Sequence, residues 1–368
     1  MRIDVKLAIA ALALSASLHG AESWKMQYLY DQDRSELEIR DLQCASSKLC
    51  VAAAVVGEQG KSKAKGALVI SSDGGEHWQL QDVSEPPYSL FFLNEANGWM
   101  ITDKGIWRTQ DSAKSWKKIN PTKGLERLYF LDESHGFAAG EQKTILETED
   151  GGKKWTKREI TDPRPMEARD VLYSGIAFEG PQHGVIWGSW NPMQRAQEAE
   201  WMVLNPAKRP KTQMSSLLLE SSDGGKDWKP FEVKVNGNIT HLRFLSSKAF
   251  LMLVEYVGAN AGPSEIFQLT SKESPELRFR QEGRSARDFA ILPGGEMVVA
   301  TVESLGKSSD VPIPGKLRMM ASSDLKNWHD EKADYRAVAK RPFLAAPDAE
   351  HVIVATDTGM ILKRVAEK

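Results

Sequence analysis

The stretch Thr148–Trp155, which reads TEDGGKKW, decides the fold because close copies of it return along the chain. Two copies keep every key position: SSDGGEHW at Ser71–Trp78 and SSDGGKDW at Ser221–Trp228. A third, TQDSAKSW at Thr109–Trp116, lacks the glycines, and a fourth, SSDLKNW at Ser322–Trp328, is one residue shorter. Such repetition indicates an architecture in which each repeat is one supersecondary unit.

The shared pattern, S/T-x-D-x-G-x-x-W, is the Asp-box or BNR repeat, and its chemistry suits a tight turn between two strands. An Asp carboxylate can accept backbone N–H groups of the turn, and Gly adopts the positive φ that such turns need. The Trp opens the following strand and can pack beneath the loop. We therefore expect a structural role for the five box aspartates. They are Asp73, Asp111, Asp150, Asp223 and Asp324.

Two further strand-like runs precede each box, so one repeat makes a four-stranded meander. The tryptophans Trp78, Trp116 and Trp155 follow one another at 38 and 39 residues, a spacing typical of propeller blades. The next box tryptophan, Trp228, comes 73 residues later, which places an insertion in the fourth blade. The sequence therefore predicts an all-β protein, a β-propeller built from Asp-box repeats.

The end of the chain predicts how the ring closes. Continuing the template gives a fifth blade over residues 239–281 and a sixth over 287–332, while the seventh, from Arg341, supplies only three strands. The missing strand is expected from the other end, where WKMQYLY at 24–30 resembles the strands that follow the boxes. Pairing the two ends would remove open sheet edges. We predict a single seven-bladed β-propeller over 24–368, closed by the N-terminal strand.

The first 23 residues resemble an export signal. They carry basic residues at the start, an apolar run over 7–14 and small residues at the end, which together predict a secretory signal peptide over 1–23. Cleavage after Ser17 and cleavage after Ala21 both fit. The apolar run is far shorter than the roughly 20 residues that a membrane span needs. We expect a periplasmic or secreted protein that is not transmembrane.

Composition and cysteine content limit the partners and cofactors. The chain has 48 Lys+Arg against 50 Asp+Glu, which lacks the basic excess of a nucleic-acid-binding protein, so no nucleic acid is expected. Cys44 and Cys50 flank a five-residue turn, a spacing that predicts a disulfide in an exported protein. Two buried free thiols are the alternative. Two thiols with no His nearby cannot supply the four ligands that zinc prefers, so no metal is expected. No cofactor is assigned.

Long loops are expected on the face opposite the Asp-boxes. They join the second and third strands of blades four, five and six, which are neighbours in the ring. Because loops on a rigid scaffold commonly carry binding sites, we expect a protein partner to bind there. The candidate partner-binding residues are Trp190, Arg195, Trp201 and Arg209. Alternatively, the longest loop folds back over the ring and buries both tryptophans.

A carbohydrate-active enzyme is the alternative to a scaffold, because some Asp-box propellers are sialidases or other glycosidases. The chain lacks the Arg-Ile-Pro start of a sialidase, and no catalytic motif is recognised, so no catalytic residue is assigned. Acidic residues end the second strand of six blades, and their recurrence favours a role in turns. They are Glu58, Asp103, Glu141, Glu255, Glu303 and Asp357. A non-catalytic propeller could also bind sugar, with Trp190 and Trp201 stacking on the rings.

The second and third repeats resemble those of a known family. FFLNEANGWMITDKGIWRTQDSAKSW (91–116) and YFLDESHGFAAGEQKTILETEDGGKKW (129–155) are similar to repeats of the photosystem II assembly and stability factors of the Ycf48 and Hcf136 type. The resemblance implies an exported seven-bladed propeller that binds a membrane protein or its assembly intermediate without catalysis. It does not imply photosynthesis. The arginine-rich patch of that family does not align securely with Arg108, Arg127 or Arg243.

These observations favour an exported, non-catalytic scaffold or assembly factor that binds a cell-envelope protein through the loops of blades four to six. The alternative is a carbohydrate-active or carbohydrate-binding propeller. The centre of the ring separates the two. Two opposed carboxyl groups with raised pKa values would favour a hydrolase, and a plugged centre would favour the scaffold.

Overall fold

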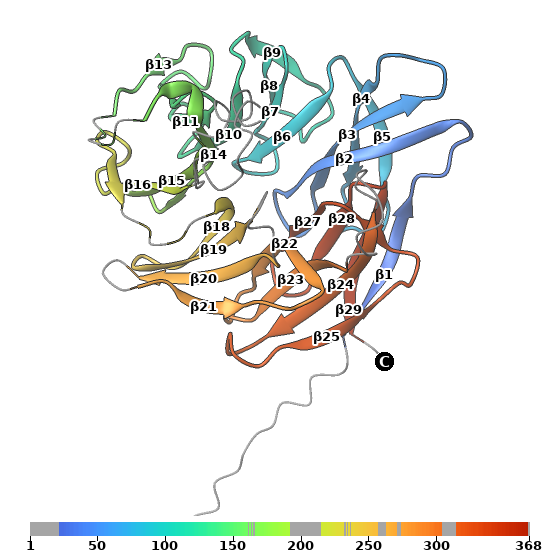
Figure 1. Cartoon of the computed structure of the whole chain (residues 1–368). Helices are drawn as coiled ribbons and strands as arrows, with labels where there is room; N and C mark the ends of the chain where they lie inside the picture. Colours follow the sequence, from blue (N-terminus) through green and yellow to red (C-terminus); the bar gives the residue numbers. More distant parts are fainter. Residues whose placement is uncertain are drawn as a thin grey trace, which may run out of the picture.

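The computed structural model describes residues 22–366, except 161, 163, 165, 192–214, 232, 234, 236, 257–262, 271–273 and 304–313. In this part of the chain the regular structure is almost entirely antiparallel β-sheet, arranged as blades around a central axis (Figure 1). One 3₁₀ helix, η1 (Ala168–Asp170), lies before the fourth blade. The all-β propeller predicted from the repeats is confirmed.

The blades are four-stranded meanders in which neighbouring strands follow the sequence. Blades 1 to 3 contain β2 (Ser35–Cys44), β3 (Cys50–Glu58), β4 (Lys65–Ser71), β5 (Gln79–Val83), β6 (Pro87–Phe92), β7 (Gly98–Thr102), β8 (Gly105–Thr109), β9 (Lys117–Asn120), β10 (Leu125–Phe130), β11 (Gly136–Gly140), β12 (Thr144–Thr148) and β13 (Thr156–Lys157). Blades 4 and 5 contain β14 (Val171–Glu179), β15 (His183–Trp190), β16 (Ser215–Ser221), β17 (Lys229–Phe231), β18 (Asn238–Ser246), β19 (Ala249–Glu255), β20 (Glu265–Thr270) and β21 (Glu276–Phe279). Blades 6 and 7 contain β22 (Arg284–Ile291), β23 (Met297–Glu303), β24 (Gly315–Ser322), β25 (His329–Ala333), β27 (Pro342–Ala345), β28 (Ile353–Thr356), β29 (Met360–Ala366) and β1 (Glu22–Leu29), with the short β26 (Val338–Ala339) beside β24.

Buried residues gather between neighbouring blades. The second strands β7 and β11 are buried along their whole length, as expected for strands that have a blade on each side. For example, Trp99 of blade 2 stacks on Phe130 of blade 3 with ring centroids 3.7 Å apart. Among the described residues every adjacent pair of blades shares such a cluster, blades 7 and 1 included. The core is therefore a ring of interfaces around the axis.

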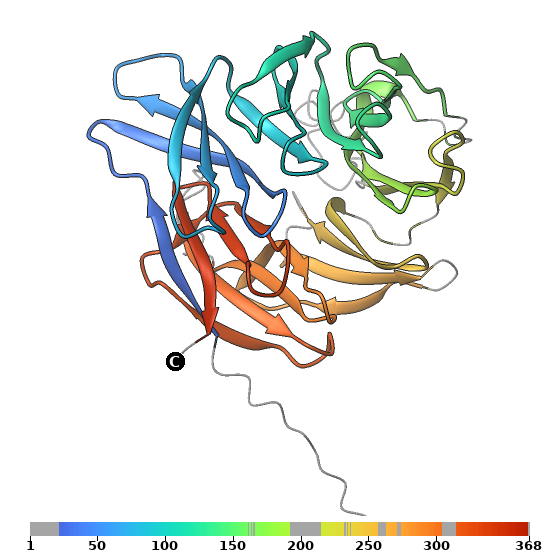
Figure 2. The same ribbon diagram turned by 180° about the vertical axis from the view of Figure 1, so that it is seen from behind.

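The N-terminal strand closes the ring, as predicted. β1 pairs antiparallel with β29, the last strand of the chain, from Glu22 opposite Ala366 to Leu29 opposite Met360. The blue β1 lies beside the red β29 in both views of the ring (Figures 1 and 2). Trp24 is 2% exposed and packs between blades 6 and 7. The two ends of the chain thus build one blade.

A second contact at this junction is not expected from the repeats. β1 also pairs in parallel with β25, which merges blades 6 and 7 into one nine-stranded sheet. The Nε1 group of Trp24 donates to Oε2 of Glu331 in β25 at 2.7 Å. Arg364 of β29 donates to Glu331 with Nε at 3.1 Å and to Glu296 at 2.8 Å. We call Trp24, Glu331, Arg364 and Glu296 the clasp.

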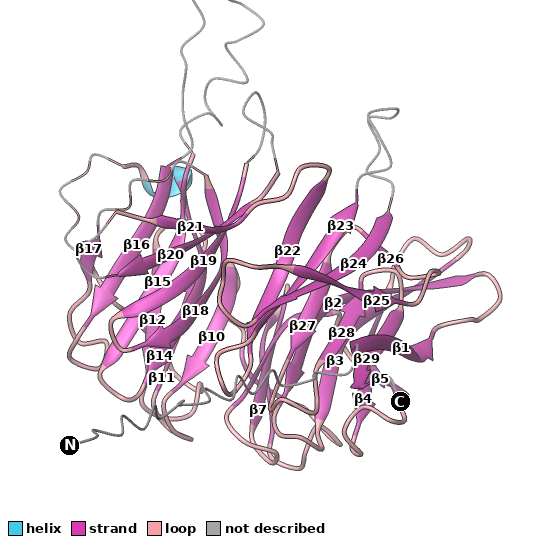
Figure 3. Cartoon of the chain, turned by 90° about the horizontal axis from the view of Figure 1, so that it is seen from below, coloured by secondary structure: helices cyan, strands magenta, loops and turns pink. Residues whose placement is uncertain are grey.

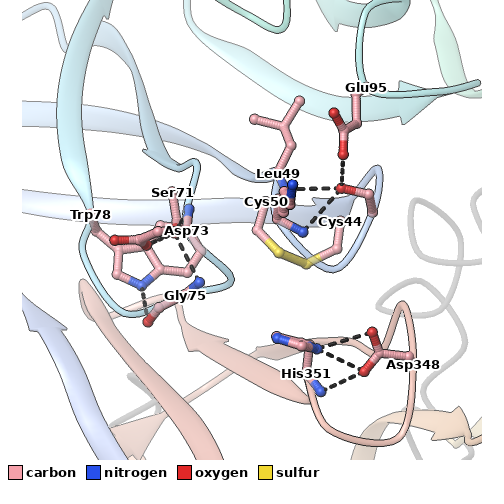
Figure 4. Close-up of a disulfide and its surroundings, with 12 residues drawn as sticks. Cys44, Leu49, Cys50, Ser71, Asp73, Gly75, Trp78, Glu95, Asp348 and His351 are labelled. Atoms are coloured by element: carbon pink, nitrogen blue, oxygen red, sulfur yellow. Dashed lines mark hydrogen bonds and ion pairs between the residues drawn. A yellow bond between two sulfur atoms is a disulfide. The ribbon is translucent and has the colours of Figure 1, made fainter.

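The Asp-box turns are held by their own side chains (Figure 4). In blade 1, Ser71 Oγ accepts the N–H of Gly75 at 2.9 Å and donates to Asp73 at 2.9 Å. Asp73 accepts the backbone N–H of His77 at 3.0 Å, and this bond is the largest of the effects that lower the pKa of Asp73 to about 2. Trp78 Nε1 donates to the carbonyl of Gly75 at 3.1 Å. The carboxylate is thus an acceptor within the turn.

The degenerate box of blade 2 keeps the same backbone path without its glycines. Gly74 and Gly75 adopt φ values of 76° and 85° in blade 1, where glycine carries no steric cost. Ser112 and Ala113 adopt 61° and 65° at the corresponding positions of blade 2. A positive φ has a steric energy cost for residues with a Cβ, so the surrounding fold must impose it on this turn.

Candidate functional site

The partner-binding residues predicted from the loops lie mostly outside the described part of the chain. Trp190 is the last residue of β15, where it is half-buried and packs against the apolar cluster between blades 3 and 4. Arg195, Trp201 and Arg209 lie outside the described residues. Their role stays a prediction. The described residues enclose a candidate site at the centre of the ring instead.

The hairpin that starts blade 1 carries a disulfide on the Asp-box face. Cys44 and Cys50 are the last register pair of β2 and β3, and their sulfur atoms lie 1.99 Å apart. Figure 4 shows the bridge beside the Asp-box of blade 1 and His351 of blade 7. Ser46, inside the hairpin, donates to Glu95 of blade 2 at 2.5 Å. The bridge therefore fixes a turn where three blades meet.

A channel follows the axis of the ring and is lined by the innermost strands. It consists of two adjoining cavities of about 780 and 420 Å³, which share Arg127 and His241 among their lining residues. The larger cavity reaches the turns that join second and third strands, because Asp103, Glu141 and Asp357 line it. We call this opening the mouth. It lies on the face opposite the Asp-boxes.

β-Bulges aim polar side chains into the channel. The register shifts in the innermost strand of six blades, for example after Ile39 in β2 and after Leu125 in β10. A bulge sets two consecutive residues against one partner residue, which re-aims a side chain. The polar residues that follow these shifts are Asp41, Ser89, Arg127, His241 and Asp288. We call these five residues the axial ring.

Two aspartates of the axial ring tie neighbouring blades together. Asp41 is 4% exposed, and its Oδ2 accepts the N–H of Leu90 in β6 at 2.8 Å. Asp288 is equally buried, and its Oδ2 accepts the N–H of Leu344 in β27 at 2.8 Å. Arg127 of blade 3 donates to Asp41 at 3.2 Å. The axial ring therefore couples inner strands, and all of its members except Ser89 line the channel.

His241 lies at the centre of the channel, where it lines both cavities. Burial lowers the pKa of His241 to about 4, and the positive charges of Arg243, Arg127 and Arg341 act in the same direction. Asp288, whose Oδ1 lies 3.6 Å from Nε2, opposes this shift. His241 is therefore neutral at neutral pH, and the charges around it are those of arginines and aspartates.

The wall of the mouth formed by blades 2 and 3 brings three carboxyl groups around one aromatic ring. Desolvation raises the pKa of Tyr88, and the charges of Glu126, Asp103 and Glu141 add to the shift. The Tyr88 hydroxyl donates to the carbonyl of Leu125 at 2.6 Å. Burial also raises the pKa of Glu126. Arg127 and Arg341 oppose this shift, and Glu141 adds to it. We call Tyr88, Asp103, Glu126 and Glu141 the acidic wall.

Most of the recurring acids at the ends of second strands belong to this site. The four that line the mouth are Asp103, Glu141, Glu255 and Asp357. Glu58 instead bonds to Lys61 and Lys65, and Glu303 to Arg318 at 2.8 Å. The acidic residues that recur at these positions therefore play two different roles. Glu58 and Glu303 form surface ion pairs, and the other four line the opening of the channel.

Sequence reasoning missed the axial ring, Tyr88 and Glu126. A signal was present: two consecutive polar residues interrupt an apolar inner strand at Arg40–Asp41, Glu126–Arg127 and Arg287–Asp288. Strict alternation allows one polar residue in two to face the axis, so a polar pair at this place indicates a bulge. Among the described residues, no group of three or more His, Cys, Asp and Glu side chains could hold a metal ion.

Comparison with known proteins places these repeats. Residues 108–200 match the family model of the Photosynthesis system II assembly factor YCF48. The photosystem II stability/assembly factor HCF136 of Oryza sativa is 26% identical over 163 residues, which cover 41% of this chain and 33% of that protein. The photosystem II assembly lipoprotein Ycf48 of Synechococcus sp. is 31% identical over 119 residues, which cover 32% of this chain and 27% of that protein. The matches span about a third of these relatives.

The fold comparison extends over the whole ring. A solved structure of YCF48 bound to a D1 peptide matches with a TM-score of 0.57 and covers 93% of this chain and 100% of that one, at 14% identity. A likeness at that identity shows a shared fold. The described residues contain no helix long and apolar enough to cross a membrane. The chain is therefore a β-propeller that contains repeats similar to those of Ycf48.

Proposed function

We propose that this chain is an exported, non-catalytic assembly factor that binds a cell-envelope protein through the loops of blades 4, 5 and 6. Its relatives are named assembly or stability factors of photosystem II, and one YCF48 has been solved with a D1 peptide. The matches span about a third of the curated relatives, so the identity of their partner is not transferred. Export rests on the signal sequence predicted over 1–23.

The observation that carries the proposal is the position of the mouth. The second strands β15, β19 and β23 end at Trp190, Glu255 and Glu303, on the same face as the mouth, which Glu255 lines. Figure 3 shows the ring edge-on, with these strands running up to that face. A concave site next to loops on a rigid scaffold is a common binding arrangement. The Asp-box side chains, by contrast, are engaged within their own turns.

Carbohydrate binding is the second candidate function. The raised pKa of Glu126 in a concave site favours it, because such groups occur at catalytic centres. Hydrolysis would require a second carboxyl group across the glycosidic bond from the first. A glycan array and a hydrolase panel test this candidate directly, with Glu126→Gln as the variant that should lose any turnover.

The proposed function is tested by crosslinked affinity purification of the tagged mature protein from its native envelope. One variant replaces residues 192–213 with a short Gly-Ser linker, and a control, Lys153→Ala, alters the Asp-box face instead. We expect wild type and control to capture the same protein and the linker variant to lose it. If the linker variant still captures the protein and the control does not, the partner binds the Asp-box face and the proposed binding face is wrong.

A further inference from the structure

We propose that the mouth is a receptor site for a positively charged segment of the protein partner, and that a lysine or arginine side chain of this segment binds at the acidic wall. This inference rests on the proposed function, because it describes the chemistry of the partner. It follows from the charge balance of the mouth, the aromatic ring within it and the size of the cavity.

The acidic residues of the mouth outnumber its arginines, six to three. Glu38 pairs with Arg40 at 3.2 Å. Glu255 pairs with Arg287, which lies beside the mouth, at 2.5 Å. Arg127 is directed toward Asp41 of the axial ring at 3.2 Å. These pairs remove most of the positive charge and only part of the negative charge.

Four carboxyl groups and one guanidinium group remain. Within the described residues, Asp103, Glu126, Glu141 and Asp357 make no ion pair, and neither does Arg341. Asp357 is engaged with the backbone N–H of residue 340 at 2.8 Å. The acidic wall is thus the part of the mouth with a carboxylate excess. Arg127 and Arg341 lie near enough to act on Glu126, but neither forms an ion pair with it.

The electrostatics of the acidic wall show that this charge is felt inside the cavity. Tyr88 and Glu126 both have raised pKa values. In both cases burial is the main cause and neighbouring carboxylates add to it, while Arg127 opposes the shift without cancelling it. A site of negative potential with low-dielectric walls concentrates cations. A cation bound there would relieve the repulsion among the three carboxylates. Because the Tyr88 hydroxyl is bonded to Leu125, the ring is the part of Tyr88 left for a ligand, and an aromatic ring also attracts a cation.

The size and the remaining lining favour a side chain carried on a peptide over a small free ion. The cavity of about 780 Å³ is much larger than one ammonium group, and Ile39, Leu172 and Phe343 add apolar surface to it. The aliphatic stem of Lys or Arg can cover such surface while its head reaches a carboxylate. The acidic wall also lies on the face where the proposal places the partner.

The test measures the binding of two synthetic peptides by fluorescence anisotropy. Both are Gly-Ser peptides of twelve residues, one with three lysines and one with three glutamates. The proteins are wild type, the double variant Glu126→Gln/Glu141→Gln, and Glu149→Gln, which makes one such substitution in blade 3 on the Asp-box face. Circular dichroism checks folding, and Asp103→Asn serves as an independent variant if the double variant is unfolded.

We expect the lysine peptide to bind wild type and Glu149→Gln equally, and its affinity to fall roughly tenfold in the double variant. Binding should weaken as the salt concentration rises from about 20 to 150 mM, because dissolved ions screen the attraction between exposed charges. At the higher concentration the Debye length is about 8 Å. The glutamate peptide should not bind. Equal binding of both peptides, or an unchanged affinity of the lysine peptide in the folded variants, would overturn the inference.

The capture experiment separates this inference from the function on which it rests. If the double variant captures the envelope partner as well as wild type does, and the linker variant does not, the proposed function stands and the cationic site is wrong. If the lysine peptide binds at the acidic wall but no envelope protein is captured by any form, the site stands and the proposed function is wrong.

Discussion

Replacing Glu331 by Gln should loosen the closure of the ring. The Glu331 side chain is 1% exposed and accepts hydrogen bonds from Trp24 of β1 and Arg364 of β29. It therefore links the last strand of blade 6 to both outer strands of blade 7. The glutamine keeps the shape and one acceptor oxygen, but it removes the charge and turns an N–H₂ group toward one of two donors.

The size of the effect follows from the bonds that are lost. A hydrogen bond to a charged group contributes about 1.5–3 kcal/mol, and removing one partner of a buried ion pair costs about 3–5 kcal/mol. Arg364 retains Glu296 at 2.8 Å, so its charge is not left alone, which places the loss near the lower end. We expect a loss of about 2–4 kcal/mol in the free energy of unfolding.

Hydrogen exchange of the β1 and β29 amides is the sharpest measurement, because these strands should open first. At about 1.4 kcal/mol per factor of ten, exchange there should accelerate by roughly 30- to 700-fold while the amides of β7 and β11 change less. Lys25→Gln, a substitution at an exposed position of β1, is the control. Unchanged exchange in β1 and β29 of Glu331→Gln would refute the view that the clasp holds the ring closed.

Four further predictions concern the turns and the channel. The melting temperature should fall as the pH drops from about 4 toward 2. The pKa of Asp73 is lower in the folded protein than its ordinary value of 3.8, so the ionised carboxylate stabilises the fold, and this stability is lost as the folded carboxylate takes up a proton. The melting temperature of the Asp73→Asn variant should depend less on pH in this range. Stability should also fall between pH 6.5 and about 4, where an unfolded His241 binds a proton and the folded one does not, so urea unfolding of His241→Asn should depend less on pH in this window. Ser112→Gly should raise the free energy of unfolding by about 0.5–1 kcal/mol by relieving the positive φ. Gly151→Ala should lower it, because the added Cβ would lie 2.9 Å from the carbonyl of Glu133; equal urea midpoints for these last two variants would contradict the strain argument.

The fold could be predicted because its determinants recur. The Asp-box is short, local and repeated, and its Ser, Asp, Gly and Trp act on one another within eight residues, as Ser71 and Gly75 do. The closing strand could be predicted from what the last blade lacked. The parallel pairing of β1 with β25 could not, because it depends on the tilt of two outer strands and leaves no periodic signal. The clasp was missed for the same reason.

The candidate site was harder to predict because it depends on bulges. A one-residue register shift changes which side chains face the axis, so reading the inner strands by strict alternation assigns residues such as Glu126 and His241 to the wrong surface. The composition of the loops suggested a binding site, but Arg195, Trp201 and Arg209 lie outside the described residues, so their positions are not known. The channel, by contrast, is well described in the structure, but the pattern of residues that lines it was not recognised in the sequence.

The two faces of the ring follow different rules, and this bears on where function lies. On the Asp-box face, corresponding positions carry nearly the same residues, because each turn needs the same hydrogen bonds. Along the axis, corresponding positions vary much more, and only the aspartate recurs. One backbone position carries Asp41, Ser89, Arg127, Gly175, His241, Asp288 and Phe343 in the seven blades. A symmetric backbone with an asymmetric lining is what a directional ligand requires, since a ring of identical side chains would bind it equally in every orientation. The acidic wall is confined to blades 2 and 3, so a cationic segment bound there has a defined place on the ring, from which it can extend across the mouth toward blades 4 to 6.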